Sequence, residues 1–161
     1  MFRKLLLPLV FSAFSTGVSA AEILLENQTK TLNLAKQMAE LMEAKAAAEG
    51  ENVVIYIVGA DARPVLIHRD PQSGFAPMDW SSEKALSSYQ TRQQTKDLSS
   101  EMKVFRVDTF SFVPGLPGGV PLVLDGKRAG AIGVSGAPVA KDQAIAEVGL
   151  AVFEKAIASQ D

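Results

Sequence analysis

Residues 118–136 read GGVPLVLDGKRAGAIGVSG, and the fold is organised around this stretch. Two apolar runs, residues 120–124 and residues 128–134, lie on either side of Asp125 and Gly126. An Asp-Gly pair between β-rich runs is typical of a hairpin with a two-residue loop, because a type I′ turn needs a positive φ at both central positions. The stretch therefore predicts two antiparallel strands joined by a tight turn.

A two-residue loop also determines which side chains lie opposite each other. Leu122 then faces Ala129, and Val120 faces Ala131. Bulky side chains of the first strand oppose small side chains of the second, which leaves a surface that a helix can approach closely. We expect this helix to be the one that follows directly in the sequence.

The C-terminal helix is predicted from Pro138 onward. Pro138 suits the first helical position, and Asp142 suits the positive end of a helix dipole. One stripe at helical spacing contains Ile145, Val148, Gly149, Val152, Phe153, Ala156 and Ile157. Glycine inside a helix costs about 1 kcal/mol relative to alanine, so Gly149 is expected where this helix touches the sheet.

Apolar periodicity and turn residues predict the remaining elements. In chain order they are a polar lead-in over residues 21–30, a helix from Thr31 or Asn33 to about Ala48, a central strand over 53–58, a second strand over 65–68, a loop over 69–80, a helix from Ser81 to about Thr95, and an aromatic-rich strand over 105–113. The inner face of the first helix is assigned to Leu34, Met38, Leu41 and Met42. Consecutive hairpins make an antiparallel sheet with helices packed on it, an α+β fold.

The first twenty residues are organised like a secretory signal peptide. A basic start at Arg3-Lys4 precedes an apolar run over residues 5–14, and small residues end at Ala20. The run is shorter than the ~20 residues of a membrane span; an uncleaved anchor is the alternative. We expect residues 1–20 to be removed, leaving a single domain over 21–161 that is periplasmic or secreted and has no stable membrane anchor.

Composition excludes several classes of function. The expected mature chain has a net charge of −4 and no strongly basic patch, so nucleic acid is not an expected partner. The chain has no cysteine, which excludes a thiol nucleophile and haem attached through C-x-x-C-H. With His68 as the sole histidine, the usual zinc sites are excluded. Ser135 does not lie in a G-x-S-x-G motif, and no catalytic residue is assigned.

Residues 118–136, together with Asp142 and the AIAEVGLAVF run, resemble the C-terminal half of the GlcG/HbpS-like domain, the haem-degrading or haem-binding domain. The matching residues are Gly118, Gly119, Pro121, Asp125, Gly126, Gly130, Ala131, Ile132, Gly133, Val134, Ser135, Gly136, Asp142, Ala146 and Gly149. The resemblance implies a profilin-like, five-stranded antiparallel sheet in an α/β/α sandwich. Gly59 departs from the family pattern, which usually has aspartate there.

The resemblance also implies an exported protein that binds or handles haem non-covalently. The candidate cofactor-binding residues are His68, Arg69, Met78, Tyr89, Gly119 and Ser135, and Met102 is a further candidate iron ligand. His68 is the candidate metal ligand, and Arg69 is a candidate partner for a haem propionate. The alternatives are that His68 is an ordinary strand-end histidine facing water and that Tyr89 packs in the core.

Residues 133–136 precede a helix, and exposed N–H groups at such a place bind anions. This turn is therefore a candidate for holding a carboxylate or a haem propionate. It lacks the Lys-Ser/Thr pair of a P-loop and the G-x-G-x-x-G spacing, so a tight strand-to-helix turn is the favoured interpretation.

Two other functions stay open beside haem binding: a small-carboxylate (glycolate-type) binding or accessory module, and a structural oligomer. A non-catalytic binding protein is favoured over an enzyme. A homo-oligomer is expected because apolar residues exceed what one small sheet needs, as at Phe105, Phe110 and Phe112. The family resemblance also implies assembly into rings or dimers.

Overall fold

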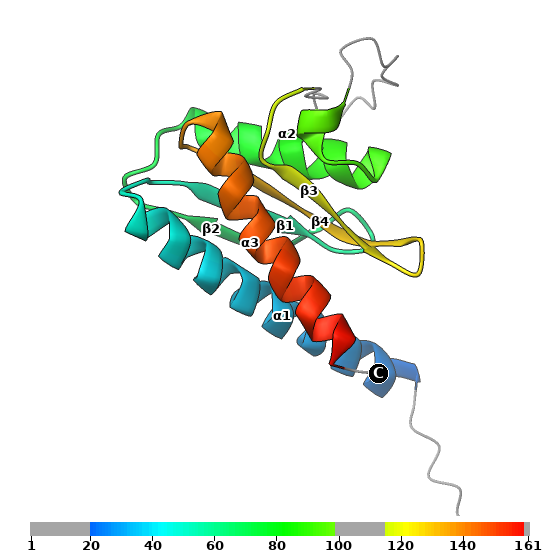
Figure 1. Cartoon of the computed structure of the whole chain (residues 1–161). Coiled ribbons are helices and arrows are strands. Elements are labelled where there is room, and N and C mark those ends of the chain that lie inside the picture. Colours follow the sequence, from blue (N-terminus) through cyan, green and yellow to red (C-terminus); the bar gives the residue numbers. More distant parts are fainter. Residues whose placement is uncertain (1–19, 99–114, 160–161) are drawn as a thin grey trace, which may run out of the picture.

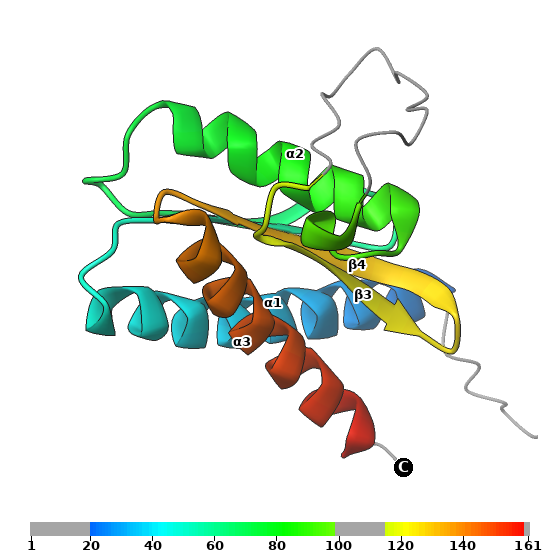
Figure 2. The same cartoon turned by 45° about the horizontal axis from the view of Figure 1, so that its top comes forward.

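The computed structural model describes residues 20–98 and 115–159, with side chains from residue 30 onward in these ranges. Its elements are α1 (Ala20–Ala48), β1 (Val54–Val58), β2 (Pro64–Arg69), α2 (Ala76–Thr91), the 3₁₀ helix η1 (Thr95–Asp97), β3 (Gly119–Leu124), β4 (Lys127–Ser135) and α3 (Val139–Ala158). They form three layers, with α1 and α3 on one face of the sheet and α2 on the other (Figures 1 and 2). The α+β fold is confirmed.

The sheet of the described residues has four strands in the order β2-β1-β4-β3, and all neighbouring strands are antiparallel. The prediction of a central strand over 53–58 is confirmed, because β1 lies between β2 and β4. The fifth strand, predicted over 105–113, lies outside the described residues. Met102 and the three phenylalanines named above also lie outside them.

The hairpin turn is confirmed, but the register of its strands differs from the prediction. Asp125 and Gly126 have φ values of 51° and 72°, as a type I′ turn requires. Beyond the first two pairs, a β-bulge inserts one extra residue, Ala129, into β4. The predicted pairs Leu122–Ala129 and Val120–Ala131 are therefore wrong by one residue: Leu122 faces Gly130, and Val120 faces Ile132.

The corrected register changes which helix covers the small residues. Gly119 pairs with Gly133 and Pro121 pairs with Ala131, and these residues face α2 rather than α3. A Cβ atom at Gly133 would lie 1.9 Å from the Ser81 carbonyl oxygen of α2. The expectation that the C-terminal helix packs over the small residues is wrong, because the slip of one residue exchanges the two faces of the strand.

The face covered by α1 and α3 contains the main hydrophobic core. Its largest side chains are Met38, Met42, Ile55, Ile57, Leu122, Ile132, Ile145 and Phe153. A Cβ atom at Gly149 would lie 2.7 Å from Ile132 Cδ1 and 2.7 Å from Met42 Sδ. The prediction for Gly149 is confirmed, since α3 touches the sheet there, and it touches α1 at the same point. Pro138 precedes α3 as its N-cap instead of opening it.

Helix α1 is longer than predicted. It begins at Ala20 instead of Thr31 or Asn33, because the sequence between Ala20 and Ala48 contains neither glycine nor proline to interrupt it. It ends at Ala48 as predicted. Met38 and Met42 are buried, whereas Leu41 is 50% exposed and does not belong to the inner face.

Helix α2 also begins earlier than predicted, at Ala76 instead of Ser81. Pro77 lies in the first turn, where proline is tolerated because its missing N–H group would have no partner there. The long loop predicted over 69–80 is therefore confined to residues 70–75, and Met78 lies on a helix. The helix ends at Thr91, before Arg92 in a left-handed conformation.

Candidate functional site

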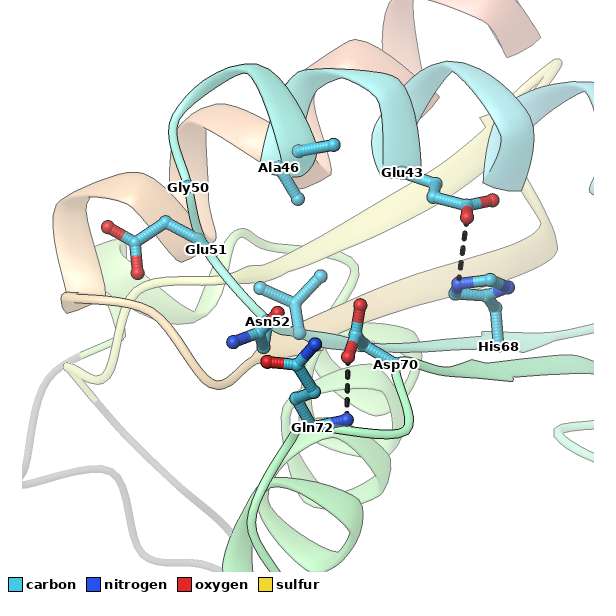
Figure 3. A pocket seen from close by; sticks show the side chains of 10 residues that line it. Glu43, Ala46, Gly50, Glu51, Asn52, His68, Asp70 and Gln72 are labelled. Atoms are coloured by element: carbon cyan, nitrogen blue, oxygen red, sulfur yellow. Dashed lines mark hydrogen bonds and ion pairs between the residues drawn. The ribbon is translucent and has the colours of Figure 1, made fainter.

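A cavity of about 360 Å³ lies where β2, the end of α1 and the chain leading into β1 meet (Figure 3). The side chains and backbone around it come from Glu43, Ala46, Ala47, Gly50, Glu51, Asn52, Val53, His68, Asp70 and Gln72. It contains the chain's only histidine, one of the residues that the sequence selects. This cavity is the candidate functional site.

His68 lies near the end of β2, opposite Ile55 of β1. Its side chain is 31% exposed, and its Nε2 atom lies 3.7 Å from the Glu43 Oε1 atom of α1 (Figure 3). A carboxylate beside one ring nitrogen of a histidine orients the ring and leaves the other nitrogen for a ligand. His68 thus lies at the wall of a cavity beside Glu43, although a third of it still meets water.

The cavity is rich in negative charge. Glu43, Glu51 and Asp70 line it, and Asp70 accepts a hydrogen bond of 2.7 Å from the backbone N–H of Gln72 (Figure 3). Glu51 accepts a hydrogen bond from Lys141, and this bond raises the pKa of the Lys141 ammonium above its ordinary value. Lys141 therefore offsets the negative charge of Glu51, whereas Lys141 does not offset the charges of Glu43 and Asp70, and the site stays acidic.

Arg69 does not lie in the cavity with His68. Consecutive residues of a strand project from opposite faces of a sheet, and the Arg69 guanidinium donates a hydrogen bond of 3.0 Å to the Ser73 carbonyl. Met78 is half-buried in the first turn of α2, and α2 covers the face of the sheet opposite α1. The structure thus separates His68 from two of the residues predicted to accompany it.

Tyr89 occupies a structural position on α2. Its ring packs against Val58, Ala85 and Ala131, and its hydroxyl donates a hydrogen bond to the Ala60 carbonyl. The Arg128 guanidinium lies 5.5 Å from the centroid of the ring. These contacts match the core-packing alternative for Tyr89.

Gly119 is buried beneath α2. Its N–H group donates a hydrogen bond of 2.9 Å to Thr95 Oγ1, and a Cβ atom there would lie 2.5 Å from the Lys84 carbonyl oxygen. No space for a cofactor remains over this residue, because the helix backbone fills it.

The turn after β4 is built for a protein carboxylate. Ser135 is buried at the end of β4, opposite Val54. The Ala137 N–H group, which an anion would use, donates a hydrogen bond of 3.0 Å to Asp142 Oδ1. A tight strand-to-helix turn therefore describes residues 133–136 better than an anion site.

The sequence interpretation missed a buried ion pair between Lys84 and Asp142. The Lys84 ammonium donates hydrogen bonds of 2.7 Å to Asp142 Oδ2 and 2.8 Å to the Val134 carbonyl, and both side chains are at most 2% exposed. Burial lowers the pKa of Lys84 and raises the pKa of Asp142, and the hydrogen bond between them opposes both shifts. The sequence contained one signal, the helical spacing of Ser81, Lys84 and Ser88. This spacing places Lys84 on the same side of α2 as the two serines, and that side faces the sheet.

Residues 20–98 and 115–159 contain neither a candidate metal site nor a candidate membrane-spanning helix. No group of three or more histidine, aspartate or glutamate side chains is arranged to hold a metal ion. Within these same ranges, no helix combines the length and apolar character needed to cross a membrane.

Comparison with known proteins adds family information to this geometry. The family model described as haem degrading protein HbpS-like matches residues 31–151. A Citrobacter freundii protein described as an uncharacterized 15.0 kDa protein in the dhaT-dhaS intergenic region is 31% identical over 133 residues. The match covers 79% of this chain and 94% of that relative.

Solved structures have the same fold. Klebsiella pneumoniae ORFY aligns with a TM-score of 0.66 and 28% identity, over 76% of this chain and 89% of its own. HbpS aligns with a TM-score of 0.64 and 26% identity, over 75% and 87%. The PduOC:haem complex aligns with a TM-score of 0.64 over 74% and 91%, and at 22% identity it shows the fold alone.

Proposed function

The chain belongs to the family of HbpS-like haem-degrading proteins, and on that premise we propose that it is an exported protein that binds haem reversibly through His68. The observation that carries this proposal is the position of His68, the only histidine of the chain, at the wall of a cavity of about 360 Å³. Histidine is a common axial ligand of haem iron. The solved PduOC:haem complex, a protein of the same fold, supports haem as the ligand class.

The residues of the cavity fit a weak haem site. His68 supplies one nitrogen ligand, Glu43 lies 3.7 Å from one nitrogen of its ring, and Ala46, Ala47 and Val53 are the apolar side chains of a lining in which polar residues predominate. A chain without cysteine has no thioether attachment, so binding is reversible. Haem bound here supplies an iron centre, and this chain's own residues coordinate and orient it. We assign no catalytic step to them.

The charge of the cavity sets the strength of binding. Haem propionates are anionic, and Glu43 and Asp70 repel them, whereas Lys141 offsets the charge of Glu51. Arg69 cannot compensate, since it projects from the other face of the sheet. Salt screens such repulsion, because the Debye length falls from about 10 Å at 0.1 M to about 3 Å at 1 M. Affinity for haemin should therefore rise with salt concentration, whereas a basic propionate clamp would make it fall.

Haemin titration followed by visible spectroscopy tests the proposal. The wild-type protein should give a saturable change in the Soret band, and His68→Ala should shift or abolish it. Met78→Ala and Tyr89→Phe are matched controls, because they remove the other described candidate ligands and should leave the band unchanged. Absence of a saturable change in the wild-type protein would refute haem binding. A His68→Ala spectrum identical to the wild type would refute only the ligand assignment.

Export is a separate part of the proposal. Its support is the basic start at Arg3-Lys4, the short apolar run and the small residues that end at Ala20. We propose a mature periplasmic or secreted protein that begins at Ala21. The intact mass of protein recovered from the periplasm or the medium tests this, and a mass that includes Met1 would contradict it.

Assembly into a homo-oligomer is also proposed. Three large apolar side chains are exposed on or near β2 and the start of α2: Phe75 at 88%, Ile67 at 44% and Trp80 at 43%. Light scattering at micromolar concentration should give more than the mass of one chain. The small-carboxylate alternative fits the cavity less well than haem does, because the Glu43 and Asp70 carboxylates would face a ligand that is little more than a carboxylate itself.

A further inference from the structure

The sheet is interrupted by two β-bulges at the end opposite His68. On β2, Val65 is the extra residue between the pairs Ile57–Leu66 and Val58–Pro64. On β4, the extra residue is Ala129. Both strands flank β1, and the two bulges lie at the same end of the sheet. Bulges bend a strand and redirect its side chains, and they are common next to binding sites.

Both extra residues line one cavity of about 130 Å³ beneath α1 and α3. Its walls are Thr31, Leu34, Ala35, Met38, Ile57, Val58, Gly59, Val65, Leu122, Ala129 and Phe153. Nine of these eleven residues are apolar, and seven are buried. The four that are not fully buried, Thr31, Leu34, Val65 and Ala129, form its mouth.

The cavity persists because the residues around it cannot collapse into it. Ala129 is too short to fill the space at the bulge, and Gly59 has no side chain that could fill it. Ile57, Leu122 and Phe153 are fixed by the surrounding core. The cavity binds water poorly, because an ordered buried water needs two to four polar partners and these walls offer few.

We propose that this cavity binds a small non-polar molecule, with the size of an aromatic ring or a short hydrocarbon of about six heavy atoms. Apolar cavities of about 150 Å³ in proteins bind benzene, and this one has a similar volume and similar walls. Met38 lines it with a flexible thioether chain that adapts to ligands of different shape. The proposal does not rest on haem binding, because none of the eleven residues lines the cavity at His68.

Benzene is the probe, and two-dimensional NMR of the full chain is the measurement. Saturable shifts are expected at the amides of Ala35, Ile57 and Ala129. Ala129→Leu fills the cavity and should weaken binding at least tenfold. Ala156→Leu is the matched control, because it makes the same change at a half-buried alanine of α3 in a different groove and should leave benzene binding unchanged.

A second variant protects the test against misfolding of Ala129→Leu. Leu34→Phe narrows the mouth from the α1 side and should also weaken binding. Wild-type protein without saturable shifts, or folded forms of both variants that bind benzene normally, would overturn the proposal. Hexanoate distinguishes a free hydrocarbon from the end of an acyl chain, because it shifts the same amides only if the cavity accepts an amphiphile.

The two ligand sites can be tested independently. Benzene binding should persist in His68→Ala and in protein saturated with haemin. Competition between haemin and benzene would overturn the claim that the cavities are separate. Failure of haemin binding alone would leave the apolar site intact.

Discussion

The two faces of the sheet are packed by different means. Beneath α1 and α3, large apolar side chains such as Met42, Ile132 and Phe153 interlock in an ordinary hydrophobic core. Beneath α2, glycines let the helix backbone rest on the strands, and a buried ion pair lies beside a small apolar cluster of Val58, Ala85 and Ala131. Side chains can adjust to a change, whereas backbone in contact with backbone cannot. The α2 face should therefore tolerate substitution less well.

The largest effect is expected from Lys84→Met. The substitution leaves the Asp142 carboxylate buried without its partner, and breaking a buried ion pair in this way costs about 3–5 kcal/mol. Urea denaturation measures the loss of unfolding free energy. The surface pair of Lys96 and Glu147, 2.9 Å apart, supplies the control. Lys96→Met should cost less than about 1 kcal/mol.

A double variant sharpens the same test. Lys84→Met combined with Asp142→Leu replaces both charges by apolar groups, and such replacements are often neutral or stabilising. The double variant should therefore recover most of the lost stability. Equal losses for Lys84→Met and Lys96→Met would show that the buried pair has no special role on the α2 face.

The next effect belongs to Gly133→Ala, and we expect a loss of about 3 kcal/mol. Its Cβ atom would lie 1.9 Å from the Ser81 carbonyl oxygen and 2.6 Å from the Ala85 nitrogen, so α2 itself must move. Thermal and urea unfolding measure the change. A stability equal to that of the wild type would mean that α2 does not rest on the strand backbone at this point.

Gly126→Val measures the cost of an unfavourable backbone conformation alone, without a steric contact of the new side chain. Gly126 has a φ of 72°, and a Cβ atom added there would have no neighbouring atom within 4 Å, so the cost comes from the turn alone. A β-branched residue is badly placed there, and the expected loss is at least about 1 kcal/mol. Lys127→Val, at the next and equally exposed position, should change the urea midpoint little. An unchanged midpoint for Gly126→Val would contradict the turn.

The smallest effect is expected from Gly149→Ala on the core face. Its Cβ atom would meet Ile132 Cδ1 and Met42 Sδ, which are the ends of flexible side chains and can shift. Alanine also favours the helix by about 1 kcal/mol. The net change should stay within about 1 kcal/mol of zero. A loss as large as that of Gly133→Ala would remove the distinction between the two faces.

Local patterns predicted the elements well. The Asp125-Gly126 turn, the apolar stripe of α3 and the contact at Gly149 all depend on neighbours in the sequence, and all are confirmed. The bulge at Ala129 could not be predicted, because the Asp-Gly turn sets the register only of the first pairs, Leu124–Lys127 and Val123–Arg128, and gives no signal of an extra residue beyond them. Without the bulge, the predicted register placed the small residues of the hairpin beneath α3 instead of α2.

The candidate site was predictable only in part. His68 stood out as the sole histidine at a strand end, but its companions Glu43 and Asp70 come from elements whose packing the sequence does not reveal. The pair of Lys84 and Asp142 is separated by 58 positions, so no local periodicity connects the two residues. Arg69 was adjacent to His68 in sequence, and strand alternation separates the two in space.

The ion pair between Lys84 and Asp142 has a consequence for how the molecule opens. Lys84 comes from the layer on one side of the sheet and Asp142 from the layer on the other, and the Val134 carbonyl holds the lysine between them. Neither helix can detach alone without stranding a charge in the interior. The amides of α2 and α3 should therefore exchange with solvent deuterium through one shared opening event, so that the three layers behave as a single cooperative unit.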